Sequence, residues 1–245
     1  MPILNRATAR LEAAFGHLPS YPGSRLDRAA LEAVLAEVGD RLADNFPYFH
    51  PLYAGQMLKP PHPIASLAYA LAMQINPNNH ALDGGRASSA MEKEAVAQLA
   101  GMFQWQRHLG HLTSGGTMAN LEALWVAGQL HPGKRIVASS QAHYTHQRIA
   151  GVLRLPFEPV PCDGRGRLNV AALERLLATG QVGTVVATMG TTAAGAVDPL
   201  DEILALRARH SFRIHADAAY GGYFSLIDNL SESTARSLGC LPQAD

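Results

Sequence analysis

Apolar residues recur at helical spacing in the first part of the chain, and they predict an amphipathic helix over Leu26 to Asn45, with Ser24 and Asp27 as a capping box at its start. The repeating residues are Leu31, Val34, Leu35, Val38 and Leu42. A proline-rich stretch from Pro47 to Pro63 follows, and it is expected to be extended because proline fixes φ and lacks a backbone donor. Further helices are predicted over Pro63 to Ile75 and over Ser89 to Met102, where Ser89 and Glu92 have capping-box spacing.

The pattern changes after Gly110, where short runs rich in β-branched residues alternate with helical stretches. The predicted strands are Arg135 to Ser139, Val182 to Met189 and Phe212 to Ala216. The predicted helices are Thr117 to Gln129, His143 to Val152, Val170 to Ala178 and Pro199 to Arg209. This alternation predicts an α/β domain with a mainly parallel sheet, in which ligands bind beyond the carboxyl ends of the strands.

Composition and charge disfavour several classes of protein, including nucleic-acid-binding and membrane-spanning proteins. The 245 residues are 47% hydrophobic and carry 20 basic and 20 acidic side chains, so charge gives no reason to expect a nucleic acid or an anionic membrane as partner. The longest apolar stretch, Ile64 to Ile75, is too short to span a bilayer, and the amino terminus lacks the apolar run of a signal peptide. Two cysteines offer no disulfide framework, and a cytoplasmic enzyme is the default expectation.

A polar glycine pair opens the helix expected after residue 116. The segment Thr113-Ser-Gly-Gly-Thr117 would leave backbone N–H groups exposed at the positive end of the helix dipole, where a phosphate binds well. Gly115 and Gly116 permit close approach, and the Thr117 hydroxyl can add a donor. The alternative is an ordinary helix start capped by Ser114 or Thr117.

A carboxylate follows the last predicted strand. Asp217, at the end of that strand, can pair with a protonated heterocyclic nitrogen, which keeps a pyridine able to accept electrons. Ala218 and Ala219 behind it leave room for a flat ring. The alternative is a buried acid that caps the following turn.

Two more strand ends carry polar residues. His143 follows the first predicted strand and can stack on a ring, although a helix-start histidine with a local hydrogen bond is the plainer alternative, and the chain has 11 histidines. Thr191 and Thr192 follow the second and can bond to a ring hydroxyl or a histidine, or simply form a turn. Asp198 is expected to cap a helix whose first residue is Pro199.

The order and placement of these motifs carry a resemblance. TSGGTMANLEAL, QAHYTH, ATMGTTAAGAVDPL and HADAAYGG, in that order, resemble the group II pyridoxal-dependent amino-acid decarboxylases, which include aromatic amino acid, glutamate and tyrosine decarboxylases. The segments Phe49 to Tyr53 and Ala87 to Glu94 look like that family's substrate-side and dimer-forming regions. The similarity covers about residues 40 to 225.

The resemblance implies a pyridoxal 5′-phosphate (PLP) cofactor, an amino-acid substrate and no metal. Residues of the four motifs would then hold the cofactor. Gly116 and Thr117, with Gly115 nearby, would bind the phosphate; His143 would stack on the ring; Thr192 would lie near its hydroxyl edge; Asp217 would pair with the pyridine nitrogen; and Ala219 would cover the opposite face. His143 and Asp217 would be the catalytic residues.

The implied fold is that of the aspartate aminotransferase-like (fold type I) large domain, working as a homodimer. Residues 1–85 would be a helical and extended dimer-forming segment. Residues 86–245 would be the PLP-binding α/β domain, incomplete at its carboxyl terminus.

The match departs from the family at the Schiff-base lysine, which the family carries in a D-S-x-x-x-D-x-H-K segment after the aspartate motif. The lysines here are Lys59, Lys93 and Lys134, and none follows that motif. We therefore expect an inactive amino-terminal fragment of a decarboxylase; half of a split enzyme and a lysine-free pseudoenzyme that binds PLP are the alternatives. Within the same fold, an aminotransferase or a carbon–sulfur lyase is the alternative chemistry.

Overall fold

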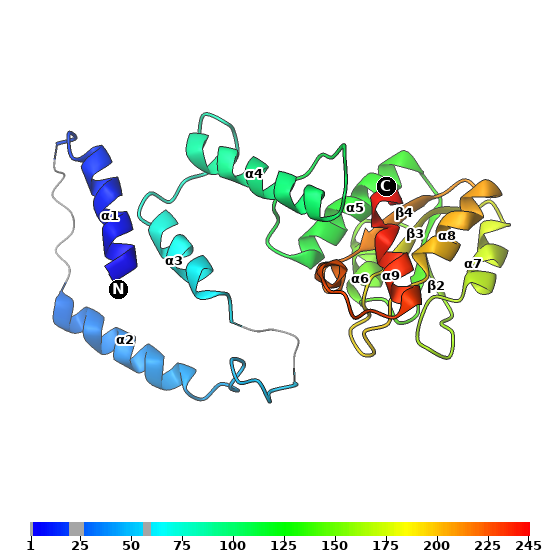
Figure 1. Ribbon diagram of the computed structural model, residues 1–245, viewed down its shortest axis with the longest axis horizontal. Coiled ribbons are helices and arrows are strands. Elements are labelled where there is room, and N and C mark those ends of the chain that lie inside the picture. The colour runs from blue at the N-terminus through cyan, green and yellow to red at the C-terminus, as the bar shows by residue number, and fades with distance from the viewer. Residues whose placement is uncertain (1, 20–26, 56–59) are drawn as a thin grey trace. The chain divides into compact units, whose positions relative to one another are not determined.

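A computed structural model describes residues 2–19, 27–55 and 60–245 (Figure 1). Contacts divide the chain into two compact units, Met1–Ser89 and Ala90–Asp245. The division expected after residue 85 stays a prediction, because it concerned dimer formation and cofactor binding rather than contacts alone.

Helices form the first unit: α1 (Pro2–Phe15), α2 (Arg28–Leu42) and α3 (Pro63–Ala72). None of their described residues is buried. Helix α2 confirms the helix predicted in this region, and Asp27 caps it through a bond from the N–H of Ala30; Ser24 lies outside the described residues. Turns occupy residues 48–52, where extended chain was expected, and helix α1 was not predicted.

Helix α4 (Arg86–Met102) begins at the end of the first unit and continues into the second. Because Ser89 lies inside this helix and its buried hydroxyl has no partner among the described residues, the predicted capping box is wrong. The carboxylate of Glu92 instead accepts a hydrogen bond from the N–H of Leu112.

A four-stranded parallel sheet in the order β2-β1-β3-β4 is the centre of the second unit. Its strands are β1 (Arg135–Ser139), β2 (Phe157–Val160), β3 (Val182–Thr188) and β4 (Arg213–Asp217). All residues of β3 are buried, as expected for a central strand covered on both faces. The three predicted strands are confirmed, and β2 was missed.

Helices cover both faces of the sheet (Figure 1). On one face α5 (Gly116–Leu130) and α6 (Thr145–Val152) bury Leu124 and Ile149 against Ile136 and Val186. On the other face the core includes residues of α7 (Val170–Leu177), α8 (Leu200–Ala205) and α9 (Glu232–Gly239). Short 3-10 helices span Leu206–Ala208, Gly222–Leu226 and Leu241–Gln243. The predicted α/β architecture with a parallel sheet is confirmed.

Two predicted helix starts are corrected. Helix α6 begins at Thr145, so His143 lies in the turn before it rather than in its first turn. Helix α8 has Pro199 as its cap, so Asp198 is not the cap. The buried carboxylate of Asp198 instead accepts hydrogen bonds from the N–H groups of Leu168 (2.7 Å) and Thr188 (2.8 Å). Asp198 therefore ties the loop after β3 to the segment before α7.

Candidate active site

The predicted site residues of the second unit gather at the carboxyl edge of the sheet. Asp217 ends β4 and pairs in register with Thr188, which ends β3. The Thr192 loop leaves β3 from that point, and the segment that carries His143 leaves β1 at Ser139. This edge is where ligands bind in parallel α/β sheets.

Asp217 is buried and receives three hydrogen bonds. Its Oδ2 accepts from Nε2 of His146 at 2.8 Å and from the side-chain amide of Asn120 at 3.3 Å. Its Oδ1 accepts from the N–H of Ala219 at 3.2 Å, which closes the turn after β4. The alternative of an acid that caps the following turn therefore holds for Oδ1. Oδ2 is bound by the side chains of Asn120 from α5 and His146 from α6.

Asp217 is held as a carboxylate. Burial acts to raise the pKa of Asp217, but the His146 hydrogen bond and charge, the Ala219 N–H and the nearby His215 outweigh burial and lower the pKa to about 2. An anion at this position can hold a proton on an adjacent basic nitrogen, because the charged pair is stabilised by a charge-assisted hydrogen bond.

His215 completes the network from the same face of β4, two residues before Asp217. Its Nε2 lies 2.7 Å from the side-chain oxygen of Asn120. Burial and the nearby His146 lower the pKa of His215 to about 4, against the attraction of Asp217. A neutral His215 can donate through Nε2 to Asn120 Oδ1, which turns the amide nitrogen of Asn120 towards Asp217.

The start of α5 has the features expected of a phosphate cradle. Gly115 caps the helix with φ 147°, and no side chain of the described part of the protein caps it. The alternative cap at Ser114 or Thr117 is therefore wrong. A Cβ added to Gly115 would meet nothing within 4 Å, whereas one added to Gly116 would lie 2.8 Å from Cβ of Ala219. The glycine pair thus borders open space and packs directly against the turn that follows Asp217.

His143 and Thr192 are less closely tied to this cluster. Nδ1 of His143 lies 2.8 Å from the hydroxyl of Thr145, as in the helix-start alternative. Thr192 is exposed in its loop, whereas its neighbour Thr191 is buried and accepts a bond from the N–H of Ala196. The ring-stacking role of His143 and the ring-edge role of Thr192 stay predictions.

Sequence reasoning missed Asn120, His146 and His215. A usable signal existed for two of them, because His215 shares a strand face with Asp217 at spacing two, and Asn120 lies one helical turn beyond Gly116 on the helix that opens at the glycine pair. His146 had no such signal, since its partner is 71 residues away in sequence.

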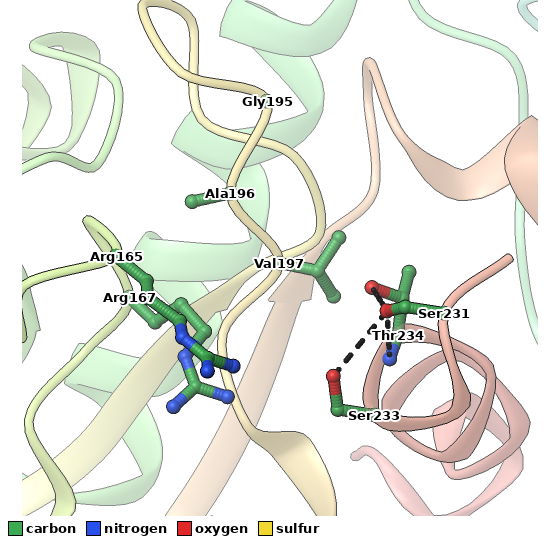
Figure 2. Close-up of a pocket in the computed structure, with 8 residues that line it drawn as sticks. All are labelled: Arg165, Arg167, Gly195, Ala196, Val197, Ser231, Ser233 and Thr234. Atoms are coloured by element: carbon green, nitrogen blue, oxygen red, sulfur yellow. Dashed lines mark hydrogen bonds between the residues drawn. The ribbon is translucent and has the colours of Figure 1, made fainter.

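A separate polar pocket of about 200 Å³ lies elsewhere on the second unit (Figure 2). Arg165 and Arg167 face the start of α9, where Ser231 accepts a bond from the N–H of Thr234. Arg167 is already paired with Asp163. None of the predicted site residues lines this pocket.

Comparison with known proteins decides the family. A sequence model described as the pyridoxal-dependent decarboxylase conserved domain matches residues 29–229. The chain belongs to the pyridoxal-dependent decarboxylase family. It is 31% identical over 168 residues to a probable L-tyrosine/L-aspartate decarboxylase of Methanoculleus marisnigri, covering 68% of this chain and 45% of that protein. It is 32% identical over 212 residues to the L-2,4-diaminobutyrate decarboxylase of Rhizobium meliloti, covering 78% and 42%.

Solved structures agree. The crystal structure of mouse CSAD in its apo form matches with a TM-score of 0.78 and 26% identity, over 97% of this chain and 52% of that one. The decarboxylase domain from Vibrio parahaemolyticus has the same fold at 24% identity, with a TM-score of 0.73. The predicted fold type I architecture is confirmed, and the chain spans about half the length of the curated relatives it matches.

Family membership implies PLP, and the residues at the carboxyl edge fit it. An anionic carboxylate suits a pyridine nitrogen, and a helix start without a side-chain cap suits a phosphate. The close packing of Gly116 on Ala219 brings the helix start near the turn after Asp217. The described residues contain no group of three or more side chains that could hold a metal ion. In the same part of the chain, no helix is long and apolar enough to cross a membrane.

Two lysines of this decarboxylase-family chain can be placed. Lys93 is exposed on α4, and Lys134 precedes β1 at the amino edge of the sheet, opposite Asp217. Lys59 lies outside the described residues. The structure therefore puts Lys134 at the wrong edge of the sheet to reach a ring held by Asp217.

Proposed function

We propose that this chain forms most of the cofactor site of a PLP-dependent amino-acid decarboxylase. Asp217 carries the proposal: a buried carboxylate with a pKa of about 2 stands at the carboxyl edge of a parallel sheet, two residues before Ala219, which packs against Gly116. If Asp217 had only a structural role, a phosphate cradle next to its turn would not be needed. If the glycine pair bound only a phosphate, a buried anion near it would not be needed.

Each group has a distinct task in this proposal. The N–H groups of Gly116 and Thr117 bind the phosphate, with Gly115 giving access. Asp217 holds a proton on the ring nitrogen. PLP supplies an electron sink for the electrons released as carbon dioxide leaves the substrate.

Three other side chains complete the proposed site around the ring. Ala219 and His143 cover its two faces and exclude water, and Thr192 meets its hydroxyl edge.

The covalent lysine is proposed to come from outside these 245 residues. A fragment of a longer enzyme is the favoured arrangement, because the matching relatives are about twice as long. The nucleotide sequence after the Asp245 codon tests this directly. A D-x-H-K-like stretch, in frame or shifted, supports a broken or split decarboxylase gene; its absence from the gene and its neighbours supports a lysine-free PLP-binding pseudoenzyme.

The proposed substrate is an α-amino acid. Related proteins are named as decarboxylases of tyrosine, aspartate and 2,4-diaminobutyrate. These side chains are aromatic, acidic and basic, so the substrate assay should include all three. Release of carbon dioxide with formation of the matching amine by the lysine-containing assembly would support decarboxylation. Keto-acid formation instead would favour an aminotransferase, and pyruvate formation from a cysteine substrate would favour a carbon–sulfur lyase.

A homodimer is the proposed working form, and α2 supports it. The apolar stripe of this helix is exposed: Val34, Leu35 and Leu42 show 56%, 60% and 62% of their surface. Monomers rarely expose contiguous apolar stripes of this kind, so a second copy is the proposed cover. Light scattering should find a dimer for the complete assembly, and Leu35→Glu should produce monomer, while Glu32→Lys on the same helix should not.

The cytoplasm is the proposed location. Both cysteines, Cys162 and Cys240, are unpaired, as expected in a reducing compartment.

Reduction with borohydride in the presence of PLP tests the lysine assignment. We expect peptide mapping by mass spectrometry to find no stoichiometric adduct on the isolated chain. A single saturable adduct at Lys59, Lys93 or Lys134, competed by pyridoxamine 5′-phosphate, would overturn the assignment.

A further inference from the structure

His146 is the most deeply buried ionisable partner of Asp217. Its side chain has no exposed surface, yet its Nδ1 has no hydrogen-bond partner among the described residues. An unpaired buried polar atom costs stability, and an apolar side chain would fill the same space without that cost. The second nitrogen, Nε2, makes one hydrogen bond to the residues that the structure describes, to Asp217 Oδ2. That hydrogen bond is therefore the polar contact through which the imidazole acts on the carboxylate.

The absence of an acceptor at Nδ1 determines the proton position. A neutral His146 gains nothing from a proton on Nδ1, whereas a proton on Nε2 is shared with a carboxylate at 2.8 Å. His146 is thus a donor to Oδ2 in its neutral form and in its charged form. Asn120 donates to the same oxygen.

Counting acceptor sites shows what remains of the carboxylate. A carboxylate oxygen offers about two lone-pair sites. Within the described part of the chain, Oδ2 accepts from His146 and Asn120, whereas Oδ1 accepts only from the Ala219 N–H. Asp217 keeps 8% of its surface exposed, and the exposed Ala219 adjoins it. One acceptor site is left, on Oδ1, the oxygen that bonds to the N–H of the exposed Ala219.

We propose that His146 is the positioning residue of Asp217: its Nε2–H occupies Oδ2 and keeps the carboxylate charged and oriented, so that Oδ1 alone receives the ring N–H of the cofactor. His215 supports this arrangement by fixing the amide of Asn120. The inference rests on the proposed cofactor site and adds to it a residue outside the predicted set. His146 touches neither substrate nor cofactor in this scheme and acts through Asp217.

Two substitutions separate the hydrogen bond from the filling of space. His146→Gln can place its amide nitrogen near the position of Nε2, whereas His146→Leu fills the space without a donor. His210→Leu is the matched control, because His210 is a half-buried histidine that faces Glu174 rather than the site. Should His146→Leu fail to fold, as judged by circular dichroism and thermal unfolding, His146→Met takes its place.

The probe is 15N-labelled pyridoxamine 5′-phosphate, which carries an amine in place of the aldehyde and needs no lysine. The 15N shift of its ring nitrogen reports protonation as the pH is raised. We expect the bound ring to release its proton at least one pH unit earlier in His146→Leu than in the wild type, about a tenfold change in proton affinity. His146→Gln and His210→Leu should follow the wild type. Equal titration of wild type and His146→Leu would overturn the proposal.

A second readout does not depend on the cofactor. The 13C shift of the Asp217 carboxyl carbon, assigned by its loss in Asp217→Asn, can be titrated in the chain alone. We expect the Asp217 carboxylate to take up its proton at higher pH in His146→Leu than in the wild type. In His146→Gln its midpoint should stay close to that of the wild type. If pyridoxamine phosphate does not bind the wild type, the proposed function fails, while this titration still decides the role of His146: an unchanged Asp217 midpoint in His146→Leu would refute it.

Discussion

Gly116 and Ala219 come from segments 103 residues apart and pack so closely that a Cβ on Gly116 would lie 2.8 Å from Cβ of Ala219. Contact this short does not occur between β-carbons without a shift of one of them. The glycine pair at the start of α5 and the turn after β4 are therefore one structural unit. In the proposed site this unit joins the group that binds the phosphate to the residue that covers the ring.

Substituting Gly116→Ala should cost about 1–3 kcal/mol in the free energy of unfolding, because the extra methyl overpacks this contact. Pyridoxamine phosphate affinity should fall as well. Urea unfolding and equilibrium binding measure the two effects. Gly151→Ala is the control, since its Cβ would meet nothing within 4 Å and alanine favours a helix. Adding Ala219→Gly should recover part of the loss; no recovery would contradict the packing explanation.

Gly221→Ala should be more damaging. A Cβ there would overlap the backbone carbonyl of Met189, which cannot rotate away as a side chain could. We expect a loss above about 3 kcal/mol, measured by chemical denaturation. Gly239→Ala has open space and serves as its control. Similar stabilities for the two variants would show that the turn after Asp217 and the loop after β3 are not packed as described.

Asp198 should make the protein more stable in mild acid than at neutral pH. Burial raises the pKa of Asp198 to about 6, despite bonds from the N–H groups of Thr188 and Leu168. Because the folded state then binds the proton more tightly than the unfolded state, this contribution is present below about pH 4 and is lost as pH rises through 6. The difference between wild type and Asp198→Asn should shrink by up to about 3 kcal/mol over that range. A difference independent of pH would refute this.

His215 should make the folded state more stable at neutral pH than in acid, the opposite of the effect of Asp198. Its pKa is lowered to about 4, so the folded state binds fewer protons than the unfolded state between about pH 4 and 6.5. Its stabilising contribution is therefore present above pH 6.5 and lost as pH falls through 4. An NMR titration of its ring should show a midpoint near 4, and a midpoint near 6.5 would contradict the buried network.

The sequence predicted those elements whose signal is local. Helix α5 and strands β1, β3 and β4 follow from periodicity and from runs of β-branched residues. Strand β2 was missed because its four residues include Pro159, which is tolerated only because β2 is at the sheet edge. The Ser89 capping box failed because α4 begins at Arg86, about one turn earlier, so Ser89 lies inside the helix.

The candidate site divides in the same way. Glycine pairs, strand ends and Asp217 are readable from residue type and position. The hydrogen bond between His146 and Asp217 cannot be predicted from the sequence in this way, because it depends on how α6 packs against β4 in the fold. Sequence reasoning chose His143 by its position after β1, while the histidine one helical turn later makes the contact to Asp217.

Equilibrium binding of pyridoxamine 5′-phosphate to the wild type and to Asp217→Asn tests the central claim most directly. Asparagine keeps the size of the side chain but not its charge, and Asp228→Asn, at an exposed position, is the matched control. We predict saturable binding to the wild type and to Asp228→Asn, with affinity reduced about tenfold or more in Asp217→Asn. Equal affinity of all three proteins, or no binding to the wild type, would contradict a PLP site built on Asp217.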